Sequence, residues 1–282
     1  MLFITTIAGI RARRAELATT GTRLAFVPTM GALHEGHLAL VRRGQELADE
    51  VWASVFVNPT QFAPGEDFER YPRNLEGDRV LLEQAGVTLL FAPSTKELYP
   101  RPSTTVIDLP ELTAGLCGVQ RPGHFQGVAL VVAKLLNIVE PHVAVFGAKD
   151  WQQAMVIRRM VEDLCLPVRV EVHPTQREDD GLARSSRNAY LARDERRAAS
   201  VLHRALEGAV AAIRAGERRG PALEAEVAAE VSGEPMTRLQ YVAAVDPDTL
   251  APLAALKDRV LLVAAVHVGA TRLIDNVLTE VC

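Results

Sequence analysis

The chain has 282 residues, of which 48% are hydrophobic and 23% are charged. This mix is typical of a globular protein with a full apolar core, and the length suits one large domain or two modest ones. The formal net charge of −4 argues against nucleic acid and anionic membranes as partners, because no overall positive field would attract them. A small anionic ligand would have to be held by local groups.

Neither membrane insertion nor secretion is indicated. The longest unbroken apolar run, Val260–Val266, is too short to cross a bilayer. The first residues place no basic region ahead of their apolar stretch, so we expect no secretory signal. The three cysteines (Cys117, Cys165 and Cys282) are odd in number and widely spaced, which fits neither a disulfide framework nor a metal site. A reducing cytoplasm is therefore the predicted location.

In the first two thirds of the chain, short runs of branched apolar residues alternate with longer amphipathic stretches. The strands predicted from the runs are Leu24–Val27, Val51–Val57, Val87–Phe91, Val143–Phe146 and Val168–Val172. The helices predicted from the stretches are Gly36–Asp49, Asn74–Ala85, Phe125–Val139 and Trp151–Leu164. This alternation predicts an α/β fold with a parallel sheet covered on both faces, whose ligands gather beyond the carboxyl ends of the strands.

The composition changes near residue 185. Apolar residues recur with helical spacing from Glu195 to Ala215, which predicts one long helix, and a second helix is expected at Pro221–Val231. Three strands should follow, at Leu239–Val245, Val260–Val268 and Thr271–Ile274. We therefore expect a large domain over residues 1–184 and a smaller α+β domain over residues 185–282.

Two histidines stand at a predicted strand-to-helix junction, in the segment Pro-Thr-Met-Gly-Ala-Leu-His34-Glu-Gly-His37. Backbone amides near Gly36 and His37 would point toward an anion at the helix start, and the two imidazoles could stabilise charge on a phosphate. A glycine-rich turn with two surface histidines explains the spacing equally well.

Uncharged amides follow the next strand, in Asn58-Pro-Thr-Gln61. Their donors and acceptors suit hydroxyls and a carboxylate, although Asn-Pro alone is more often an ordinary turn. After a later strand, Lys149 could meet a phosphate and Asp150 a ribose hydroxyl or Mg²⁺, with Gln153 about one helical turn further on. A Lys-Asp pair at a helix start is more often a solvated cap.

The segment Arg177–Asn188 places paired serines between arginines, which fits either a mobile anion clamp or a charged hinge loop. His124, three residues after Arg121, precedes a predicted helix, and a lone histidine there predicts a cap without a functional role. Taken together, four polar segments at strand carboxyl ends favour a nucleotide and a small polar acid as ligands.

These segments resemble one family in their order and spacing. Pro-Thr-Met-Gly-Ala-Leu-His-Glu-Gly-His, Phe-Val-Asn-Pro-Thr-Gln-Phe, Arg-Pro-Gly-His-Phe-Gln-Gly-Val, Phe-Gly-Ala-Lys-Asp-Trp-Gln-Gln and Asp-Gly-Leu-Ala-Arg-Ser-Ser-Arg-Asn are similar to motifs of pantothenate synthetases (pantoate–β-alanine ligases). The similarity covers nearly the whole chain. His-x-Gly-His alone marks only a wider nucleotidyl-transferring superfamily, whereas its combination with Asn-Pro-Thr-Gln-Phe is specific.

The resemblance implies a Rossmann-like domain that binds ATP and pantoate, a smaller C-terminal lid domain, and a homodimer. The implied reaction joins pantoate to β-alanine through a pantoyl-adenylate, with AMP and pyrophosphate as leaving products. ATP would act as a substrate together with Mg²⁺, which is expected to be held mainly through the ATP phosphates.

The resemblance also implies the site residues. His37 is the expected proton donor, and His34 and Lys149 would complete the catalytic set. Gln61 would hold pantoate and β-alanine, Gln153 would hold pantoate, and we add Asn58 to the substrate site. The implied ATP contacts are Met30, Gly31, Ala32, Leu33, His34, Glu35, Gly36, His37, Gly147, Ala148, Lys149, Asp150, Gln176, Arg184, Ser185, Ser186 and Arg187.

The chain departs from the family pattern at two positions. Ala148 stands where the family usually has Glu, and Arg184 stands where it has an aliphatic residue; both put ATP affinity, not the reaction, in question. Two other functions remain open, a nucleotidylyltransferase that stops at nucleotide transfer and a nucleotide-sensing module without turnover. Gln61 and Gln153 argue against the transferase, because they suit a small hydroxy acid.

Overall fold

The computed structural model describes residues 1–281, and their contacts form two compact units. Unit 1 comprises Met1–Ala148 and Gln152–Pro174. Unit 2 comprises Lys149–Trp151 and Thr175–Cys282, of which Cys282 lies outside the described residues. The domain boundary expected between residues 184 and 185 stays a prediction.

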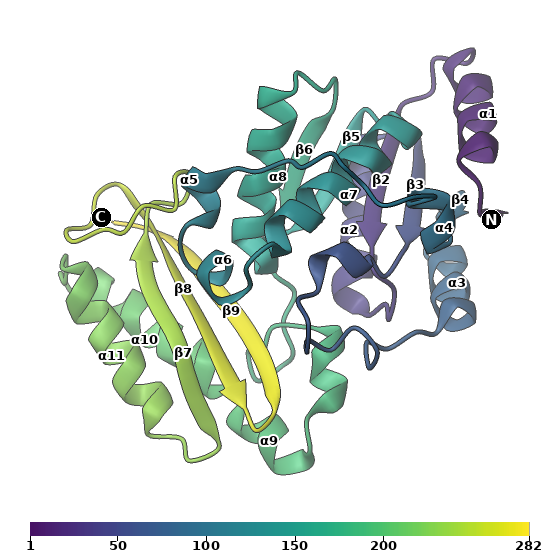
Figure 1. Cartoon of the computed structure of the whole chain (residues 1–282). Helices are drawn as coiled ribbons and strands as arrows, with labels where there is room; N and C mark the ends of the chain where they lie inside the picture. The colour runs from purple at the N-terminus through teal and green to yellow at the C-terminus, as the bar shows by residue number, and fades with distance from the viewer. Residues whose placement is uncertain (282) are drawn as a thin grey trace. The chain divides into compact units, whose positions relative to one another are not determined.

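Unit 1 is built on a six-stranded sheet in the order β1-β4-β3-β2-β5-β6 (Figure 1), and every neighbouring pair is parallel. The five predicted strands are confirmed, and β1 at the edge of the sheet is an addition. The strands are β1 (Leu2–Ile4), β2 (Leu24–Thr29), β3 (Glu50–Val55), β4 (Leu89–Phe91), β5 (Val143–Gly147) and β6 (Arg169–His173).

Both faces of this sheet are covered, as predicted. Consecutive residues Leu24 to Val27 of β2 are fully buried, and successive side chains in a strand point to opposite faces. Apolar residues of α2 and α3 pack with Ala25 and Val27 on one face. Helix α7 contacts β2 and α1. The helices of this part of the chain are α1 (Ile7–Ala18), α2 (Glu35–Leu47), α3 (Leu75–Gln84), α4 (Thr95–Leu98), α5 (Pro110–Thr113), α6 (Cys117–Gln120), α7 (His124–Val139) and α8 (Trp151–Asp163).

The strand order reverses between β2 and β5. From β2 the chain proceeds outward through β3 and β4, and it then returns to place β5 on the other side of β2. In open α/β sheets the crevice at such a reversal, beyond the carboxyl ends of the strands, is where ligands bind. Here those ends are Thr29 and Gly147, each followed by a segment expected to bind ATP.

Unit 2 contains a three-stranded antiparallel sheet, β7 (Thr237–Val245), β8 (Arg259–Val268) and β9 (Thr271–Glu280), in that order. Helices α10 (Val201–Arg214) and α11 (Gly220–Ser232) share a hydrophobic core with it. The smaller α+β architecture is as predicted.

Two predicted elements of unit 2 were wrong in extent. The single helix expected from Glu195 to Ala215 is divided into α9 (Arg193–Ala198) and α10, and the Ser200 hydroxyl at the junction donates to the carbonyl of Arg197. Serine hydroxyls compete in this way with helical hydrogen bonds. The third strand continues to Glu280 instead of ending at Ile274, because Asp275 and Asn276, which follow Ile274 directly, are buried in the sheet and the pairing with β8 extends to Glu280.

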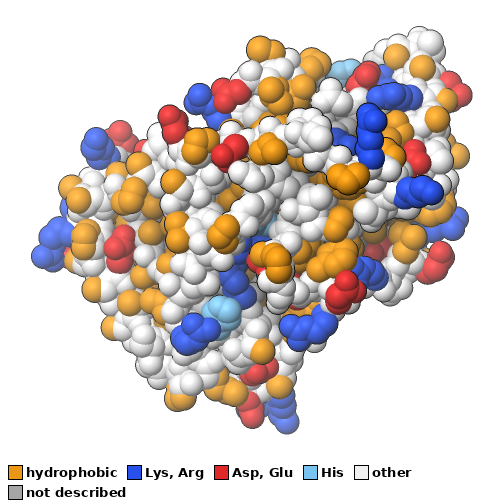
Figure 2. Space-filling model, viewed as in Figure 1, with side chains coloured by type: hydrophobic (Ala, Val, Ile, Leu, Met, Phe, Trp, Pro, Cys, Tyr) orange, Lys and Arg blue, Asp and Glu red, His pale blue; other side chains and the backbone are white. Residues whose placement is uncertain are grey.

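Charged side chains of both signs are interspersed over the face shown in Figure 2. This distribution accords with the small net charge of the sequence. Within residues 1–281 we find no helix that combines the length and the hydropathy needed to cross a bilayer.

Candidate active site

The two histidines lie at the start of α2, just beyond the carboxyl end of β2. His34 is the N-cap of the helix, and its Nδ1 accepts a hydrogen bond from the amide of Gly36 at 3.2 Å. The Nδ1 of His37 accepts from the amide of His34 at 3.3 Å, and the two ring centroids are 4.1 Å apart. Because each Nδ1 is an acceptor, each neutral ring carries its proton on Nε2. The helix start therefore places two imidazole rings beside the positive end of the helix dipole.

A buried carboxylate holds the turn that precedes this helix. Asp78 of α3 accepts hydrogen bonds from the amides of Ala32 at 2.9 Å and of Leu33 at 2.7 Å. Burial raises the pKa of Asp78, although these two amides act in the opposite direction. Ala32 has a positive φ of 51°, an uncommon conformation for a residue other than glycine. Asp78 thus fixes a strained turn and occupies two amides that an anion would otherwise meet.

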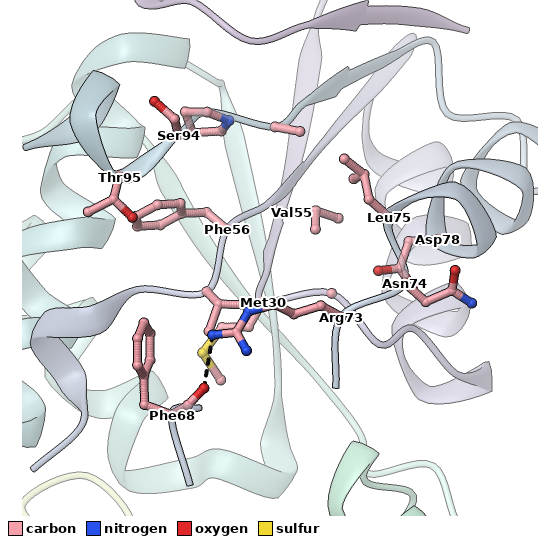
Figure 3. Close-up of a pocket in the computed structure, with 14 residues that line it drawn as sticks. Met30, Val55, Phe56, Phe68, Arg73, Asn74, Leu75, Asp78, Ser94 and Thr95 are labelled. Atoms are coloured by element: carbon pink, nitrogen blue, oxygen red, sulfur yellow. Dashed lines mark hydrogen bonds between the residues drawn. The ribbon is translucent and has the colours of Figure 1, made fainter. Parts of the chain in front are cut away.

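A cavity of about 300 Å³ lies beside this turn. Figure 3 shows Asn74 and Asp78 on its α3 side, with Phe56 and Phe68 on the opposite side. The guanidinium of Arg73 donates to the carbonyl of Phe68 at 2.9 Å, the bond drawn in Figure 3. The two charged side chains of the cavity wall, Arg73 and Asp78, therefore form hydrogen bonds with the backbone of the surrounding loops.

Asn58 and Gln61 follow β3, which is paired directly with β2. The Asn58 side chain is 1% exposed, and its Oδ1 accepts from the Thr60 hydroxyl at 3.0 Å and the Tyr99 hydroxyl at 3.1 Å. Its Nδ2 must then be the donor toward Gln61 Oε1, at 3.1 Å. This orientation turns Nε2 of Gln61 away from Asn58 and toward Met30 Sδ, 3.0 Å away. Asn58 thereby decides which atom of the Gln61 amide a ligand would meet.

His124 has a contact that its sequence context did not indicate. Its Nδ1 is 2.8 Å from the carbonyl oxygen of Gln61, and its Nε2 is 3.0 Å from Nη1 of Arg121. Arg121 also donates to the Gln61 carbonyl at 3.3 Å and forms two hydrogen bonds with the Glu66 carboxylate. A Cβ at Gly127 would stand 2.3 Å from the carbonyl oxygen of Thr60, so only glycine lets α7 approach this loop. Two side chains, Arg121 and His124, therefore hold the backbone carbonyl of Gln61.

Of the two adjacent glutamines of α8, only the second is suited to bind a ligand. Gln152 is buried, and its amide bonds the carbonyls of Leu112 and Gly115 and the amide of Cys117. Gln153 is half-buried, and its side chain forms no hydrogen bond with the residues described in the structure. Gln153 belongs to unit 1, as do Gly147 and Ala148 at the end of β5.

The remaining candidate residues belong to unit 2. Lys149 is 18% exposed in its side chain and lies 3.8 Å from the Asp150 carboxylate. Ser185 caps a 3₁₀ turn, η3 (Ser186–Tyr190), by accepting a hydrogen bond from the amide of Arg187 at 3.3 Å. Arg184 lies 3.1 Å from the Glu178 carboxylate, and its amide donates to the carbonyl of Gln176.

The structure therefore brings His34, His37, Met30 and Gln61 to the carboxyl ends of two paired strands in unit 1. Lys149, Asp150, Gln176 and the segment from Arg184 to Arg187 have their described contacts within unit 2. Among residues 1–281 no three His, Cys, Asp or Glu side chains are grouped as a metal site. The unit 1 cluster supplies neutral amides and imidazole donors, which suit a phosphate and a small polar acid.

The chain is similar over nearly its full length to a described family and to solved structures. A family model described as pantoate-beta-alanine ligase matches residues 2–278. A pantothenate synthetase of Moorella thermoacetica is 52% identical over 281 residues, covering 100% of this chain and 99% of the relative. The pantothenate synthetase structure from Thermus thermophilus matches with a TM-score of 0.93 at 47% identity, covering 98% of this chain and 99% of that one. The pantoate-beta-alanine ligase of Francisella tularensis, solved with β-γ ATP and β-alanine, matches with a TM-score of 0.81 at 33% identity, covering 99% and 97%.

Proposed function

The chain belongs to the pantoate–β-alanine ligase family, and from this premise and the geometry of the site we propose that it condenses pantoate with β-alanine at the expense of ATP. The reaction proceeds through a pantoyl-adenylate and releases AMP and pyrophosphate. The observation that carries the proposal is the placement of the His34 and His37 rings, 4.1 Å apart, at the start of α2 and just beyond the carboxyl end of β2.

The first step transfers AMP to the acid. A carboxylate is a poor acyl donor, so an oxygen of pantoate attacks the α-phosphorus of ATP and forms a mixed anhydride, while pyrophosphate leaves. Positioning and neutralisation of charge carry most of the catalysis of such a step. His34 and His37 donate to the phosphates, and His37 is the residue assigned as proton donor. Lys149 completes the catalytic set.

The other ATP contacts are assigned from the motifs of the family. In unit 1 they are the segment from Met30 to His37 together with Gly147 and Ala148. Ala32 and Leu33 contribute through the shape of the turn, because Asp78 occupies their amides. In unit 2 they are Lys149, Asp150, Gln176, Arg184, Ser185, Ser186 and Arg187.

The second step uses the acid site. Gln61 holds pantoate and β-alanine, and Gln153 holds pantoate, so that the amine of β-alanine attacks the acyl carbon and AMP leaves. Nε2 of Gln61 carries two hydrogens, and Met30 is its one hydrogen-bond partner among the described residues. Asn58 belongs to this site as the residue that orients Gln61, because its own polar atoms bond to protein groups.

Three further features complete the proposal. Mg²⁺ bound with ATP would neutralise charge on the phosphates, and the half-exposed Asp150 carboxylate beside Lys149 is a side chain that would suit this hard cation. The enzyme works in the cytoplasm, which suits its few, widely spaced cysteines. It acts as a homodimer, as expected for its family.

The test is the release of AMP from ATP by the purified chain. We expect AMP only when Mg²⁺, pantoate and β-alanine are all present, and pantothenate in equal amount. A nucleotidylyltransferase would release pyrophosphate without β-alanine-dependent AMP, and a binding module would release neither. Either result refutes the proposed reaction, and Gln61→Ala, which should weaken pantoate binding and spare ATP binding, checks that the activity belongs to this site.

A further inference from the structure

Two adjacent polar residues are buried in strand β9. Asp275 is 4% exposed and Asn276 is 7% exposed. Neighbouring residues of a strand point to opposite faces of the sheet, so the two side chains lead in opposite directions. Buried polar groups destabilise a fold unless hydrogen bonds compensate them, and the partners of these two residues therefore indicate their role.

Asn276 holds the main chain of Lys149. Its Nδ2 donates to the carbonyl oxygen of Lys149 at 2.9 Å. The same segment is held a second time two residues later, where Nε1 of Trp151 donates to the carbonyl of Pro247 at 2.8 Å. Because these two bonds restrain the backbone on either side of residue 150, Asn276 helps to hold the main chain from which the Lys149 side chain extends.

Asp275 holds Arg177 by two hydrogen bonds, from Nη1 at 2.6 Å and from Nη2 at 3.0 Å. Nη1 and Nη2 of Arg177 also donate to backbone carbonyls, of Gly181 at 3.1 Å and of Asn276 at 3.2 Å respectively. A planar guanidinium with this set of partners is fixed in orientation, which a lysine could not reproduce. Arg177 therefore connects the loop at residue 181 to strand β9.

That loop leads directly into the serine segment. Arg177 pairs with Ala183 as an antiparallel bridge, and the amide of Arg184 donates to the carbonyl of Gln176 at 2.9 Å. The tip of the loop fits closely against α10, since a Cβ at Gly181 would stand 2.2 Å from Cδ2 of His203. The Asp275–Arg177 pair thus fixes the backbone of the residues that directly precede Ser185.

We propose that Asp275 and Asn276 are positioning residues for ATP use, which set the place of Lys149 and of the segment from Ser185 to Arg187 from a single strand. The inference deepens the proposed function and rests on its assignment of these groups to ATP. Catalytic groups displaced by about 1 Å can lose about 100-fold in rate, so a rigid strand is a suitable support for them.

The test separates the use of ATP from stability. Asn276→Leu keeps the branched shape of the side chain and removes the donor to Lys149, and Asp275→Asn keeps the shape and removes the charge. We expect each to lower kcat/KM for ATP by about tenfold or more, as misplacement of charged groups does, and to leave KM for pantoate within about twofold. Gln240→Leu is the matched control, because the hydrogen bond that it removes, from Arg272 at 2.8 Å, lies in the same sheet and involves neither Lys149 nor Arg177.

Arg177→Gln in combination with Asp275→Asn supplies a second measurement. If the pair acts as a unit, the double variant should be no worse toward ATP than the more impaired single variant. Melting temperatures follow folding, and Asn276→Ala replaces Asn276→Leu if the latter does not melt cooperatively.

The inference is overturned if both β9 variants melt at lower temperature but keep the wild-type kcat and KM for ATP, or if Gln240→Leu impairs ATP use equally. Failure of the proposed function has a different signature, since the wild-type chain would then form no pantothenate. ATP affinity by calorimetry would still report whether β9 positions these groups.

Discussion

Replacement of Asn58 by aspartate should reverse the side-chain amide of Gln61. In the wild type, Asn58 Nδ2 donates to Gln61 Oε1 at 3.1 Å, so Nε2 of Gln61 points away from Asn58. A carboxylate at position 58 has no hydrogen to donate, and it would face Gln61 Oε1 and the carbonyl of Gly127. Gln61 can relieve the repulsion by rotating its amide, which would turn Oε1 toward the ligand.

The size of the effect follows from the bond that is exchanged. A hydrogen bond from an amide to a carboxylate contributes about 1.5–3 kcal/mol, and an oxygen in its place removes that contribution. At about 1.4 kcal/mol per factor of ten, KM for pantoate should rise by about 10- to 100-fold. ATP affinity in the absence of pantoate should stay close to that of the wild type, because the donors of His34 and His37 are not held by Asn58.

Steady-state titration of pantoate at saturating ATP and β-alanine measures the change, and calorimetry measures ATP binding. Tyr99→Phe is the matched control, since it removes a hydrogen bond to Asn58 Oδ1 at 3.1 Å and leaves Nδ2 in place. We expect the control to lose some stability and to keep KM for pantoate within about twofold, because a typical hydrogen bond contributes only about 1 kcal/mol. If Tyr99→Phe raises KM as much as Asn58→Asp, or if Asn58→Asp leaves KM unchanged, the orientation of Gln61 is not what binds pantoate.

Three further predictions concern the other groups. His37→Ala should fold normally and slow adenylate formation by about two to three orders of magnitude in single-turnover experiments, as loss of a preorganised donor does; near-normal formation would remove His37 from the chemistry. Arg187→Ala should impair ATP use severely, whereas Arg184→Leu should be mild because Arg184 already pairs with Glu178 at the surface; equal damage in paired ATP titrations would contradict this division. For Glu66, burial raises the carboxyl pKa but the hydrogen bonds and charge of Arg121 outweigh it and leave the pKa below its ordinary 4.5. The unfolded state then binds the proton more readily, so the stabilisation is present above about pH 4.5 and is lost as the pH falls through the folded pKa. Denaturant titrations of Glu66→Gln should show a shallower loss of stability below pH 4.5 than the wild type, and parallel curves would exclude the effect.

The sheet of unit 1 could be predicted from the sequence because its strands are buried on both faces and therefore read as continuous apolar runs. The edge strand β1 gave no such signal, since it has three residues and two of them, Leu2 and Phe3, are 51% and 39% exposed. The histidine pair at the start of α2 could also be predicted from the sequence. Its hydrogen-bond partners lie within three residues, as those of a helix cap do, so the local pattern indicates them.

The role of His124 could not be predicted in this way. Its partner, the carbonyl of Gln61, lies 63 positions earlier in the chain, so no local pattern connects them. The same holds for Asn58, whose bonds to Tyr99 and Gly127 span 41 and 69 positions. For these residues the sequence motif identified the segment, and only the fold shows what each side chain holds.

The third strand of unit 2 shows the physical reason why such predictions fail near a site. The strand was expected to end at Ile274, directly before Asp275 and Asn276, yet the sheet continues through both residues to Glu280. Among the described residues nine polar or charged side chains are buried. Six of them form hydrogen bonds with one another or with residues in or next to the segments assigned to substrates. These six are Asn58, Gln61, Asp78, His124, Asp275 and Asn276. Burial of each has a cost in stability that an apolar residue would not have, so their places are better explained by the positions they impose than by the stability they add. A buried polar residue that breaks a strand or helix pattern is therefore itself a signal of a site, and in β9 it points to Lys149 and Arg177.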